Sequence, residues 1–420
     1  MIRRKVLLIA FHFPPFSTSS GLQRTLSLAN QLPSFDWEPL VLTANVLAYP
    51  AAERLHSELV PAELTICRSF ALDAKRHFSV FGRYPRALAI PDRWSSWFYS
   101  AVPAGLSLVK KHSPSVIWST YPLATAHLIG AAIARRTQLP WVADFRDPMI
   151  EQIGNTWYPS ESRLRAARLK IEKQVAHFAN AASFCTATAR DIFVARHGCR
   201  DAASNYQVIA NGFDEGSFSR AERLPATPVP DHLHIVHSGT LYPGPDRDPT
   251  TLLKAMAQLR SDNRLPQKLR VTLRATGHDS VFQPLIRELD LTRYVELAPP
   301  LPYAAALREM LDADGLLLFQ GKTSNPAIPA KAYEYIRARR PILALAAEDG
   351  ETARMLRGVK AATIASFDDV DRTTAVLDRF LNKLQSDFEK ISDDTIVSEY
   401  SRTKRVEEFA DLFSRVSSLR

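Results

Sequence analysis

A lysine and a glutamate stand three residues apart near the start of one expected helix. They are Lys331 and Glu334, in the stretch NPAIPAKAYEYIRARRPILAL of residues 325–345. Pro329 suits a first helical turn, and residues three apart share one helix face. At this positive end of the helix dipole, an ammonium group can meet a phosphate, and a carboxylate can accept hydrogen bonds from two neighbouring hydroxyls. The competing interpretation is a plain ion pair between the two side chains, which the spacing alone favours.

A second loop with suitable chemistry covers residues 238–249, SGTLYPGPDRDP, between an expected strand and an expected helix. Gly239 and Gly244 allow the backbone to approach a ligand closely, and the forked guanidinium group of Arg247 can bind a phosphate. The loop lacks the Gly-Lys-Ser/Thr ending of a Walker loop. It indicates an anion site without identifying the ligand.

Three charged residues follow another expected strand, in the stretch VADFRDP of residues 142–148. Asp144, Arg146 and Asp147 are costly to bury at a sheet edge unless they are paired. They form either a structural Asp–Arg cluster or a polar substrate site, and their position favours neither. The earliest such loop, residues 12–24, has Gly21 as its only glycine. Taken alone, it is best explained as a plain strand-to-helix connection.

Two Asp-x-Asp pairs are candidates for a divalent cation: Asp246 with Asp248, and Asp312 with Asp314. The first pair flanks Arg247 and can simply neutralise it. The second pair lies in an ordinary helix-to-strand turn. No H-E-x-x-H or G-x-S-x-G motif is present in the sequence. We therefore expect neither a metal site nor a serine or zinc hydrolase.

Strands and helices alternate along most of the chain, which predicts two doubly wound α/β domains with parallel sheets. The three prolines of residues 219–232 predict a linker. We expect an N-terminal domain of residues 1–218, a C-terminal domain of residues 233–395, and a last helix within residues 396–420 that packs back on the first domain. The expected strands cover residues 5–11, 39–43, 115–119, 141–144, 183–186, 207–210, 234–237, 270–276, 295–297, 316–319 and 342–345. The expected helices cover residues 21–32, 123–136, 163–179, 249–258, 280–289, 304–313, 330–338 and 399–418.

The composition is that of a globular protein, with 46% hydrophobic and 23% charged residues. The longest uncharged apolar stretch has 12 residues, whereas a membrane-spanning helix needs about 20. Three cysteines without a C-x-x-C pair suit a reducing compartment, so we expect a cytoplasmic protein.

The positive charge is concentrated in the first half of the chain. Residues 1–210 contain 24 Lys and Arg against 14 Asp and Glu, and residues 211–420 contain 29 against 30. This imbalance favours an anionic partner such as the inner face of the plasma membrane.

Within that half, residues 75–97 interleave basic and aromatic side chains. They are Lys75, Arg76, Arg83, Arg86 and Arg93 with Phe78, Phe81, Tyr84, Trp94 and Trp97. The pattern suits a membrane interface or a lipid-linked acceptor. Single-stranded nucleic acid and an insertion with inward aromatics are the alternatives; we expect no nucleic acid partner.

Taken together, these motifs resemble the glycosyltransferases of the GT-B fold, of the retaining family 4 type, over nearly the full length. The resemblance is carried by KVLLIAFHFPPFSTSSGLQRTLSLANQL, by VIWSTYPLATAHLIG followed by PWVADFRDPM, by VIANGFD, by HSGTLYPGPDRDPTTLLKAM and by PAKAYEYIRARRPILAL. PWVADFRDPM is similar to a subgroup with a D-F-R-D-P stretch. The implied fold is two Rossmann-like domains facing each other across a cleft, with a nucleotide-sugar donor on the C-terminal domain.

The resemblance also implies roles for individual residues. Glu334 matches the second glutamate of the family's E-x7-E pattern, which holds the ribose, whereas Pro326 replaces the first. The implied donor-binding residues are Gly239, Thr240, Arg247, Ala327, Ile328, Lys331 and Glu334. Arg146, Asp147 and Arg247 are the implied catalytic residues, and Ser20, Gly21 and Asp144 are the implied acceptor-binding residues.

The implied reaction moves a sugar from a nucleotide-diphosphate sugar to a glycan or lipid-linked acceptor with retention, in polysaccharide or glycolipid biosynthesis. The leaving diphosphate accepts the proton of the acceptor, so neither a protein nucleophile nor a cofactor is implied. Two alternatives are open: a sugar-nucleotide epimerase of the same fold, and a non-catalytic relative that binds glycans or acts as a scaffold.

Overall fold

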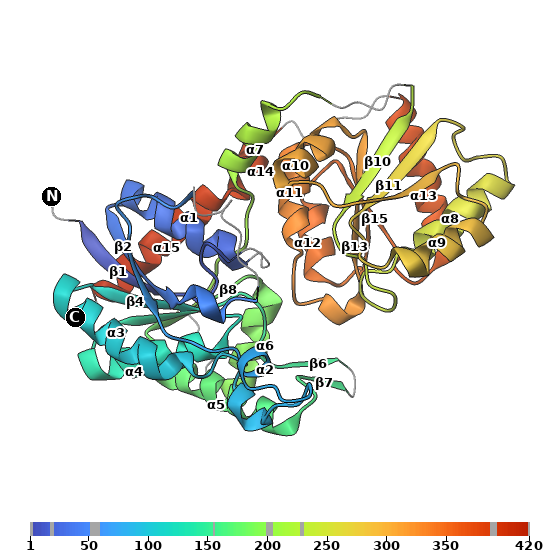
Figure 1. Ribbon diagram of the computed structural model, residues 1–420. Coiled ribbons are helices and arrows are strands. Elements are labelled where there is room, and N and C mark those ends of the chain that lie inside the picture. The colour runs from blue at the N-terminus through green and yellow to red at the C-terminus, as the bar shows by residue number, and fades with distance from the viewer. Residues whose placement is uncertain are drawn as a thin grey trace. The chain divides into compact units, whose positions relative to one another are not determined.

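The computed structural model describes residues 3–16, 21–50, 59–153, 156–198, 205–226, 231–386 and 393–418. They form two compact units, Met1–Asn211 with Arg402–Arg420, and Gly212–Ser401 (Figure 1). The division falls at Asn211 rather than at residue 218, and the expected linker begins inside helix α7 (Glu215–Glu222). The side chain of Asp214 caps this helix by accepting from the amide of Ser217, and the helix ends before the first proline of that stretch.

The first unit is built on a parallel sheet with helices on both faces. Among the described residues, its strand order is β3-β2-β1-β4-β5-β8-β9. Successive residues of β1 point to opposite faces, so Val6 and Leu8 belong to one buried cluster and Leu7 and Ile9 to the other. The strands are β1 (Arg4–Ile9), β2 (Trp37–Ala44), β3 (Thr65–Ser69), β4 (Val116–Thr120), β5 (Trp141–Phe145), β8 (Ala181–Phe184) and β9 (Tyr206–Val208). A short antiparallel hairpin, β6 (Glu151–Ile153) and β7 (Thr156–Tyr158), follows β5.

The last helix of the chain, α15 (Arg402–Ser417), completes one face of this unit. In Figure 1 it is the red helix among the blue elements β1, β2 and α1. Phe413 packs edge-on against Trp37, and Phe409 packs against Trp118 in the same way. The other helices of this unit are α1 (Gly21–Gln31), α2 (Ala74–His77), α3 (Trp97–His112), α4 (Ala124–Thr137), α5 (Ser162–Phe178) and α6 (Ala187–His197), with short 3₁₀ helices η1 (Leu32–Phe35), η2 (Val46–Ala48) and η4 (Arg86–Ala89).

The second unit repeats the same architecture with strand order β12-β11-β10-β13-β14-β15 among the described residues. The chain moves outward from β10 in one direction, returns, and continues from β13 in the other, so β10 and β13 flank the switch point of the sheet. The strands are β10 (Leu233–Ser238), β11 (Leu269–Arg274), β12 (Val295–Ala298), β13 (Gly315–Gln320), β14 (Ile342–Ala346) and β15 (Ala362–Ala365). The helices after α7 are α8 (Thr250–Ser261), α9 (Asp279–Glu288), α10 (Tyr303–Asp312), η6 (Lys322–Ser324), α11 (Ala330–Ala338), α12 (Glu351–Arg357), α13 (Val370–Ser386) and α14 (Asp394–Glu399).

The expected strands are confirmed apart from shifts of a few residues at their ends, whereas several elements were not foreseen. They include the strands β3, β6, β7 and β15 and the helices α2, α3, α6, α7, α12 and α13. The expected helix of residues 399–418 is interrupted, since Ser401 bridges to Phe213 between α14 and α15. None of the helices in the described residues is both long and apolar enough to cross a bilayer.

A buried ion pair joins α1 to β5 in the first unit. Arg24 Nη2 lies 2.9 Å from Asp144 Oδ1, and the Asp144 side chain is completely buried. Arg24 also donates to the carbonyl oxygens of Ile209 and Ala210 and lies 4.8 Å above the ring of Phe409. The Arg24 guanidinium group therefore connects α1 to three other parts of the unit: β5, the residues that follow β9, and α15.

We predict that Asp144→Asn strongly destabilises the protein, because it leaves the Arg24 charge buried without its carboxylate. Breaking a buried pair in this way typically costs about 3–5 kcal/mol. Denaturant unfolding measures the loss. The matched control is Asp147→Asn, since Asp147 carries the same group three residues later but is exposed. Equal midpoints for both variants would show that the pair does not stabilise the unit.

Candidate functional site

Two loops meet at the switch point of the second sheet. One follows β10 (residues 239–249) and the other follows β13 (residues 321–329). The Gly321 amide donates to the Asp246 carbonyl at 2.5 Å, and a Cβ atom on Gly321 would lie 1.8 Å from the Pro245 carbonyl oxygen. Only glycine fits this contact. The two loops are thus fixed against one another at the edge where open α/β sheets bind ligands.

The side chain of Lys331 lies directly on the backbone of Gly239. A Cβ atom on Gly239 would lie 2.3 Å from Lys331 Cε and 2.4 Å from Nζ. Gly239 also has a φ of +127°, which residues with a side chain rarely adopt. The two residues, 92 positions apart in the sequence, are brought together as the sequence predicted for a phosphate site.

The Lys331 ammonium group lies in an environment that disfavours its charge. Burial and, to a smaller extent, the positive charge of Arg247 lower its pKa to about 8, while Glu334 opposes the shift. Neighbouring His237 is buried and its pKa is lowered to about 3, so it remains neutral. A cation that is costly in the empty protein is suited to neutralise an anion that enters the site.

Glu334 is buried one turn after the start of α11, with 9% of its side chain exposed. It accepts a hydrogen bond of 2.7 Å from the hydroxyl of Tyr303, which begins α10. Lys331 and Glu334, both described, do not form the ion pair that the spacing favoured, because Lys331 turns to Gly239 instead. The Glu334 carboxylate is therefore fixed by Tyr303 and not by Lys331.

Helix α11 presents its N-terminus to the same edge. Pro329 occupies the cap position, and no side chain caps the first turn. Tyr335 anchors the helix, since its hydroxyl accepts from the Ser238 amide at 3.3 Å. Free amides at a helix N-terminus bind anions.

The expectation that both amides near residues 327 and 328 are available for the donor is wrong for one of them. Ala327 N–H donates to the Ser324 carbonyl at 2.9 Å, because residues 321–327 fold into a turn around η6. The Ile328 amide has no acceptor among the described residues.

Arg247 lies close enough to act on the charges of Lys331 and His237. Its Nε lies 3.6 Å from Asp246 Oδ2, and its guanidinium group lies 5.8 Å from the ring centre of Tyr242. Thr240 is half-buried beside Gly239. The predicted residues Gly239, Thr240, Arg247, Lys331 and Glu334 therefore share one edge of one unit.

The acidic pairs that resembled cation ligands are used within the fold. Asp248 accepts from the amides of Gly244 and Thr250, and Asp246 faces Arg247. Asp312 pairs with Arg308, and Asp314 accepts from the His234 amide. In the part of the chain that the structure describes, no three His, Cys, Asp or Glu side chains gather as metal ligands would.

In the first unit, the charged residues of the VADFRDP stretch lie in different environments. The prediction that Asp144 binds the acceptor is wrong, since its carboxylate is fully buried and accepts from Arg24, Thr120 and Ser183. Asp144 forms the structural Asp–Arg cluster, but with Arg24 rather than Arg146. Ser20 lies outside the described residues, and Gly21 is the first residue of α1.

Arg146 is positioned differently. Its Nε and Nη1 atoms are buried and lack a hydrogen-bond partner among the described residues, and Asp147 beside it is exposed. Burial, and then the Arg146 charge, lower the pKa of His12 to about 3. Buried Nδ1 of His12 also lacks a partner, while its ring stacks on Phe16. These groups form a second polar site, at the carboxyl edge of β1 and β5.

Sequence reasoning assigned no role to Tyr303 or His12. Tyr303 gave no signal, because it is separated from Glu334 by a strand and a helix. His12 lay in the first strand-to-helix loop, and only the folded structure brings it within reach of the Arg146 charge.

Comparisons with known proteins concern the family of the first unit and the fold of the whole chain. Residues 21–212 match the glycosyl transferase 4-like domain family. No curated protein sequence matches the chain. The chain has the GT-B fold. Its whole length superimposes on the whole of sucrose-phosphate synthase from Thermosynechococcus elongatus, with a TM-score of 0.68 and 14% identity.

Two further solved structures with this fold are similar to the chain, and one of them is named as an epimerase. The Anabaena protein HepE in complex with UDP-glucose is 16% identical, with a TM-score of 0.63 over 98% of this chain and 99% of that one. A putative UDP-N-acetylglucosamine 2-epimerase from Listeria monocytogenes is 11% identical, with a TM-score of 0.59 over 97% and 95% of the two chains. The resemblance to GT-B glycosyltransferases is thus confirmed, whereas the fold alone does not choose between transfer and epimerisation.

We predict that Lys331→Met stabilises the protein at pH 7, by about 1–3 kcal/mol, because it removes a charge that burial penalises. In the folded protein the lysine loses its proton near pH 8, and in the unfolded chain near pH 10.5. The gain should therefore shrink as the pH rises from 8 towards 10.5. Thermal midpoints at pH 7 and pH 10 test this.

The matched control is Lys254→Met, since Lys254 is an exposed lysine on α8 of the same unit. It should change the midpoint little at either pH. A loss of stability in Lys331→Met at pH 7 would contradict the electrostatic description of the site.

Proposed function

We propose that the protein is a glycosyltransferase that moves a sugar from a nucleotide-diphosphate sugar to a glycan or lipid-linked acceptor, with retention at the anomeric carbon. The observation that carries the proposal is the contact of Lys331 with Gly239 at the switch point. It places an ammonium group that has no ion-pair partner in the described part of the chain beside a helix N-terminus and a fixed carboxylate. A diphosphate joined to a ribose requires this combination of groups.

The donor is proposed to be a UDP-sugar. The HepE structure contains UDP-glucose, and the name of the Listeria monocytogenes epimerase contains a UDP-sugar, UDP-N-acetylglucosamine. In this chain, Glu334 would accept hydrogen bonds from the ribose hydroxyls, with Tyr303 orienting the carboxylate. The Ile328 amide lies on the loop that the resemblance assigns to the transferred sugar.

The chemistry requires stabilisation of the leaving group. Breaking the bond between sugar and diphosphate develops negative charge on the diphosphate, and fixed cations at that position lower the barrier. Lys331, Arg247 and the N-terminus of α11 supply positive charge at one edge. Thr240 stands where the family resemblance places an arginine, so Lys331 carries a larger share of this role.

The first unit would supply the acceptor side. Arg146, with two buried nitrogens that lack a partner among the described residues, is proposed to bind the transferred sugar or the acceptor, together with Asp147. Ser20 and Gly21 remain proposed acceptor contacts, with Gly21 at the start of α1. We place the enzyme in the cytoplasm, at the inner face of the plasma membrane, in the synthesis of a polysaccharide or glycolipid, and without a cofactor.

We predict that Glu334→Gln lowers the affinity for UDP roughly ten- to hundredfold, because hydrogen bonds to a charged group contribute about 1.5–3 kcal/mol each. Glu334→Ala should lose more. Glutamine and alanine are both good helix formers, so α11 should still fold in the two variants. Calorimetric titration of UDP measures the change. The control is Glu288→Gln, an exposed glutamate on α9, which should bind UDP like the wild type.

The same proteins, incubated with UDP-sugars, separate the three candidate activities. A transferase without its acceptor slowly releases UDP and free sugar, an epimerase releases an isomeric UDP-sugar, and a scaffold releases neither. Two residues differ from the family pattern: Pro326 stands in place of a glutamate and Thr240 in place of an arginine. These two differences favour the scaffold. Equal UDP affinity in wild type and Glu334→Gln would remove the ribose site from the proposal.

A further inference from the structure

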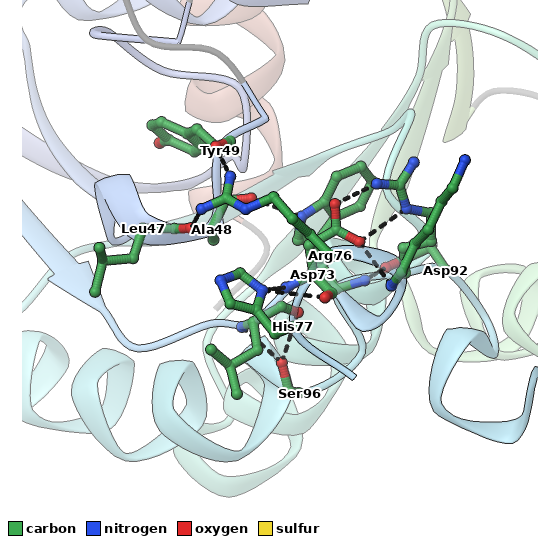
Figure 2. A network of polar contacts seen from close by, with 12 residues as sticks. Leu47, Ala48, Tyr49, Asp73, Arg76, His77, Asp92 and Ser96 are labelled. Atoms are coloured by element: carbon green, nitrogen blue, oxygen red, sulfur yellow. Dashed lines mark hydrogen bonds and ion pairs between the residues drawn. The ribbon is translucent and has the colours of Figure 1, made fainter. Parts of the chain in front are cut away.

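Residues 70–99 form a platform on the first unit that is fixed at its base. Figure 2 shows the network around Asp73, which is buried, pairs with Arg93 and caps α2 by accepting from the Lys75 amide. The Ser96 hydroxyl donates to the Leu72 carbonyl and accepts from the Leu72 amide. The platform is therefore presented in a defined conformation.

Further contacts tie this platform to the end of β2. Arg76 donates to the carbonyl oxygens of Leu47 and Tyr49, and Trp94 Nε1 donates to the Ala48 carbonyl at 2.9 Å. Trp97 is fully buried and donates to Ser69. The inward-facing interpretation of the aromatic residues thus holds for Trp97, which belongs to the core, and in part for Trp94, which is half-buried against it.

The charges that remain exposed on the platform are positive. Both of its carboxylates, Asp73 and Asp92, are buried and accept hydrogen bonds within the fold. Lys75, Arg83 and Arg86 are exposed and make no ion pair among the residues that the structure describes. An arrangement of this kind is complementary to a surface of phosphate groups.

A tight turn at the centre of the platform presents an aromatic ring to solvent. Val80 and Arg83 exchange both backbone hydrogen bonds, and Phe81 and Gly82 between them have φ of +50° and +75°. Such two-residue turns ordinarily contain Asn or Gly. Here Phe81 is fully exposed at the tip, at 101% of its reference area, beside Val80 at 66%. A phenylalanine in a strained conformation without a packing partner points to a role outside the folded chain.

An apolar groove lies behind this turn. Its volume is about 360 Å³, which suits a small-molecule ligand. Its walls come from α2, η4 and the start of α3, and include Leu72, Phe78, Leu88, Ile90, Phe98 and Tyr99. Phe78, Leu88 and Tyr99 are themselves exposed at its rim.

A second hollow, of about 760 Å³, shares the wall residue Ile90 with the groove and is polar. Arg86, Arg93 and Arg168 line it together with Asp92 and Glu161. Arg93 already pairs with Asp73, and the Asp92 carboxylate is held by the amides of Trp94 and Thr125. Arg86 and Arg168 therefore stand against one remaining carboxylate, Glu161. An apolar chain in the groove would thus have a basic hollow next to its end.

We propose that residues 70–99 are a lipid-binding surface on which Val80 and Phe81 enter an anionic bilayer, Lys75, Arg83 and Arg86 contact its phosphates, and the apolar groove receives one hydrocarbon chain of a phosphate-linked lipid. That this lipid is the acceptor rests on the proposed function, whereas binding to the bilayer does not. Single-stranded nucleic acid fits less well, because Trp97 is buried in the core, the Trp94 indole is held by the Ala48 carbonyl, and the apolar groove has no use for a base.

The turn is tested with the full chain and vesicles of phosphatidylcholine and phosphatidylglycerol. The Phe81→Trp variant should shift its emission to the blue on binding, and lipids brominated in the acyl chain should quench it. Phe178→Trp is the control, because Phe178 is an exposed phenylalanine on α5, outside the platform. Quenching equal in both variants, or in neither, would overturn the insertion of Phe81.

The charges are tested by sedimentation with the same vesicles at low salt. Changing Lys75, Arg83 and Arg86 to Ser should weaken binding about fivefold per charge, hence roughly a hundredfold together. Phosphatidylcholine alone should bind the wild type weakly. Binding that is indifferent to these charges and to salt would contradict the surface, as would binding of a single-stranded oligonucleotide in place of vesicles.

The groove is tested by calorimetry with dodecyl phosphate below its micellar concentration. The wild type should bind it, whereas inorganic phosphate and dodecyl maltoside should bind at least tenfold more weakly. Leu88→Asp, at the exposed rim, should remove the binding. Equal binding of inorganic phosphate would show that no hydrocarbon chain is recognised and would overturn this part.

UDP titration separates this inference from the proposed function. Phe81→Ser and Leu88→Asp should bind UDP like the wild type, and unchanged thermal midpoints show that the first unit still folds. UDP binding without vesicle binding refutes the lipid surface alone. Vesicle binding without UDP binding refutes the donor site alone.

Discussion

The close approach of the Lys331 ammonium group to the backbone of Gly239 is the constraint on which the donor site depends. No side chain fits between them, so the glycine fixes the path of the lysine, and the lysine fills the space that the glycine leaves. The contact occurs where β10 and β13 part, and the Gly321 contact with Pro245 holds the two loops there. Changes at any of these positions should therefore affect the same site.

The charged groups inside the two units are treated in two opposite ways. In the first unit, the Asp144 carboxylate and Arg24 neutralise each other, and the hydroxyls of Thr120 and Ser183 complete the network. Such a network stabilises the sheet edge and leaves no group for a ligand. Lys331 and Arg146, by contrast, have no carboxylate in ion-pair contact among the described residues. Charges that folding does not neutralise are the ones available to a substrate.

The sequence was sufficient for most of the sheet strands, though not for β3 and β15 at the sheet edges, and for the residues of the donor edge. Buried parallel strands are continuous apolar runs, and the loops after them contain glycine and charge. It was insufficient wherever a partner is distant in the chain. The spacing of Lys331 and Glu334 favoured an ion pair, but packing against Gly239 and Tyr303 prevailed. Asp144 and Arg146 are two residues apart and looked equivalent, yet β5 ends at Phe145, so Asp144 lies inside the sheet and Arg146 lies in the loop that follows it. Helices α3 and α13 were missed for a different reason, since aromatic or charged residues interrupt their apolar pattern.

Proton uptake on UDP binding tests the central claim most directly, because it reports on the Lys331 ammonium group itself. Calorimetric titrations at pH 8, in two buffers with different ionisation enthalpies, give the number of protons that the protein takes up. With a pKa of about 8 in the free protein, Lys331 is half protonated, and a bound diphosphate should complete its protonation. We predict an uptake of about half a proton per UDP in the wild type. The Lys331→Met variant should show weaker binding and no such uptake. Equal uptake in both proteins, or none in the wild type, would contradict the role of Lys331 in the diphosphate site.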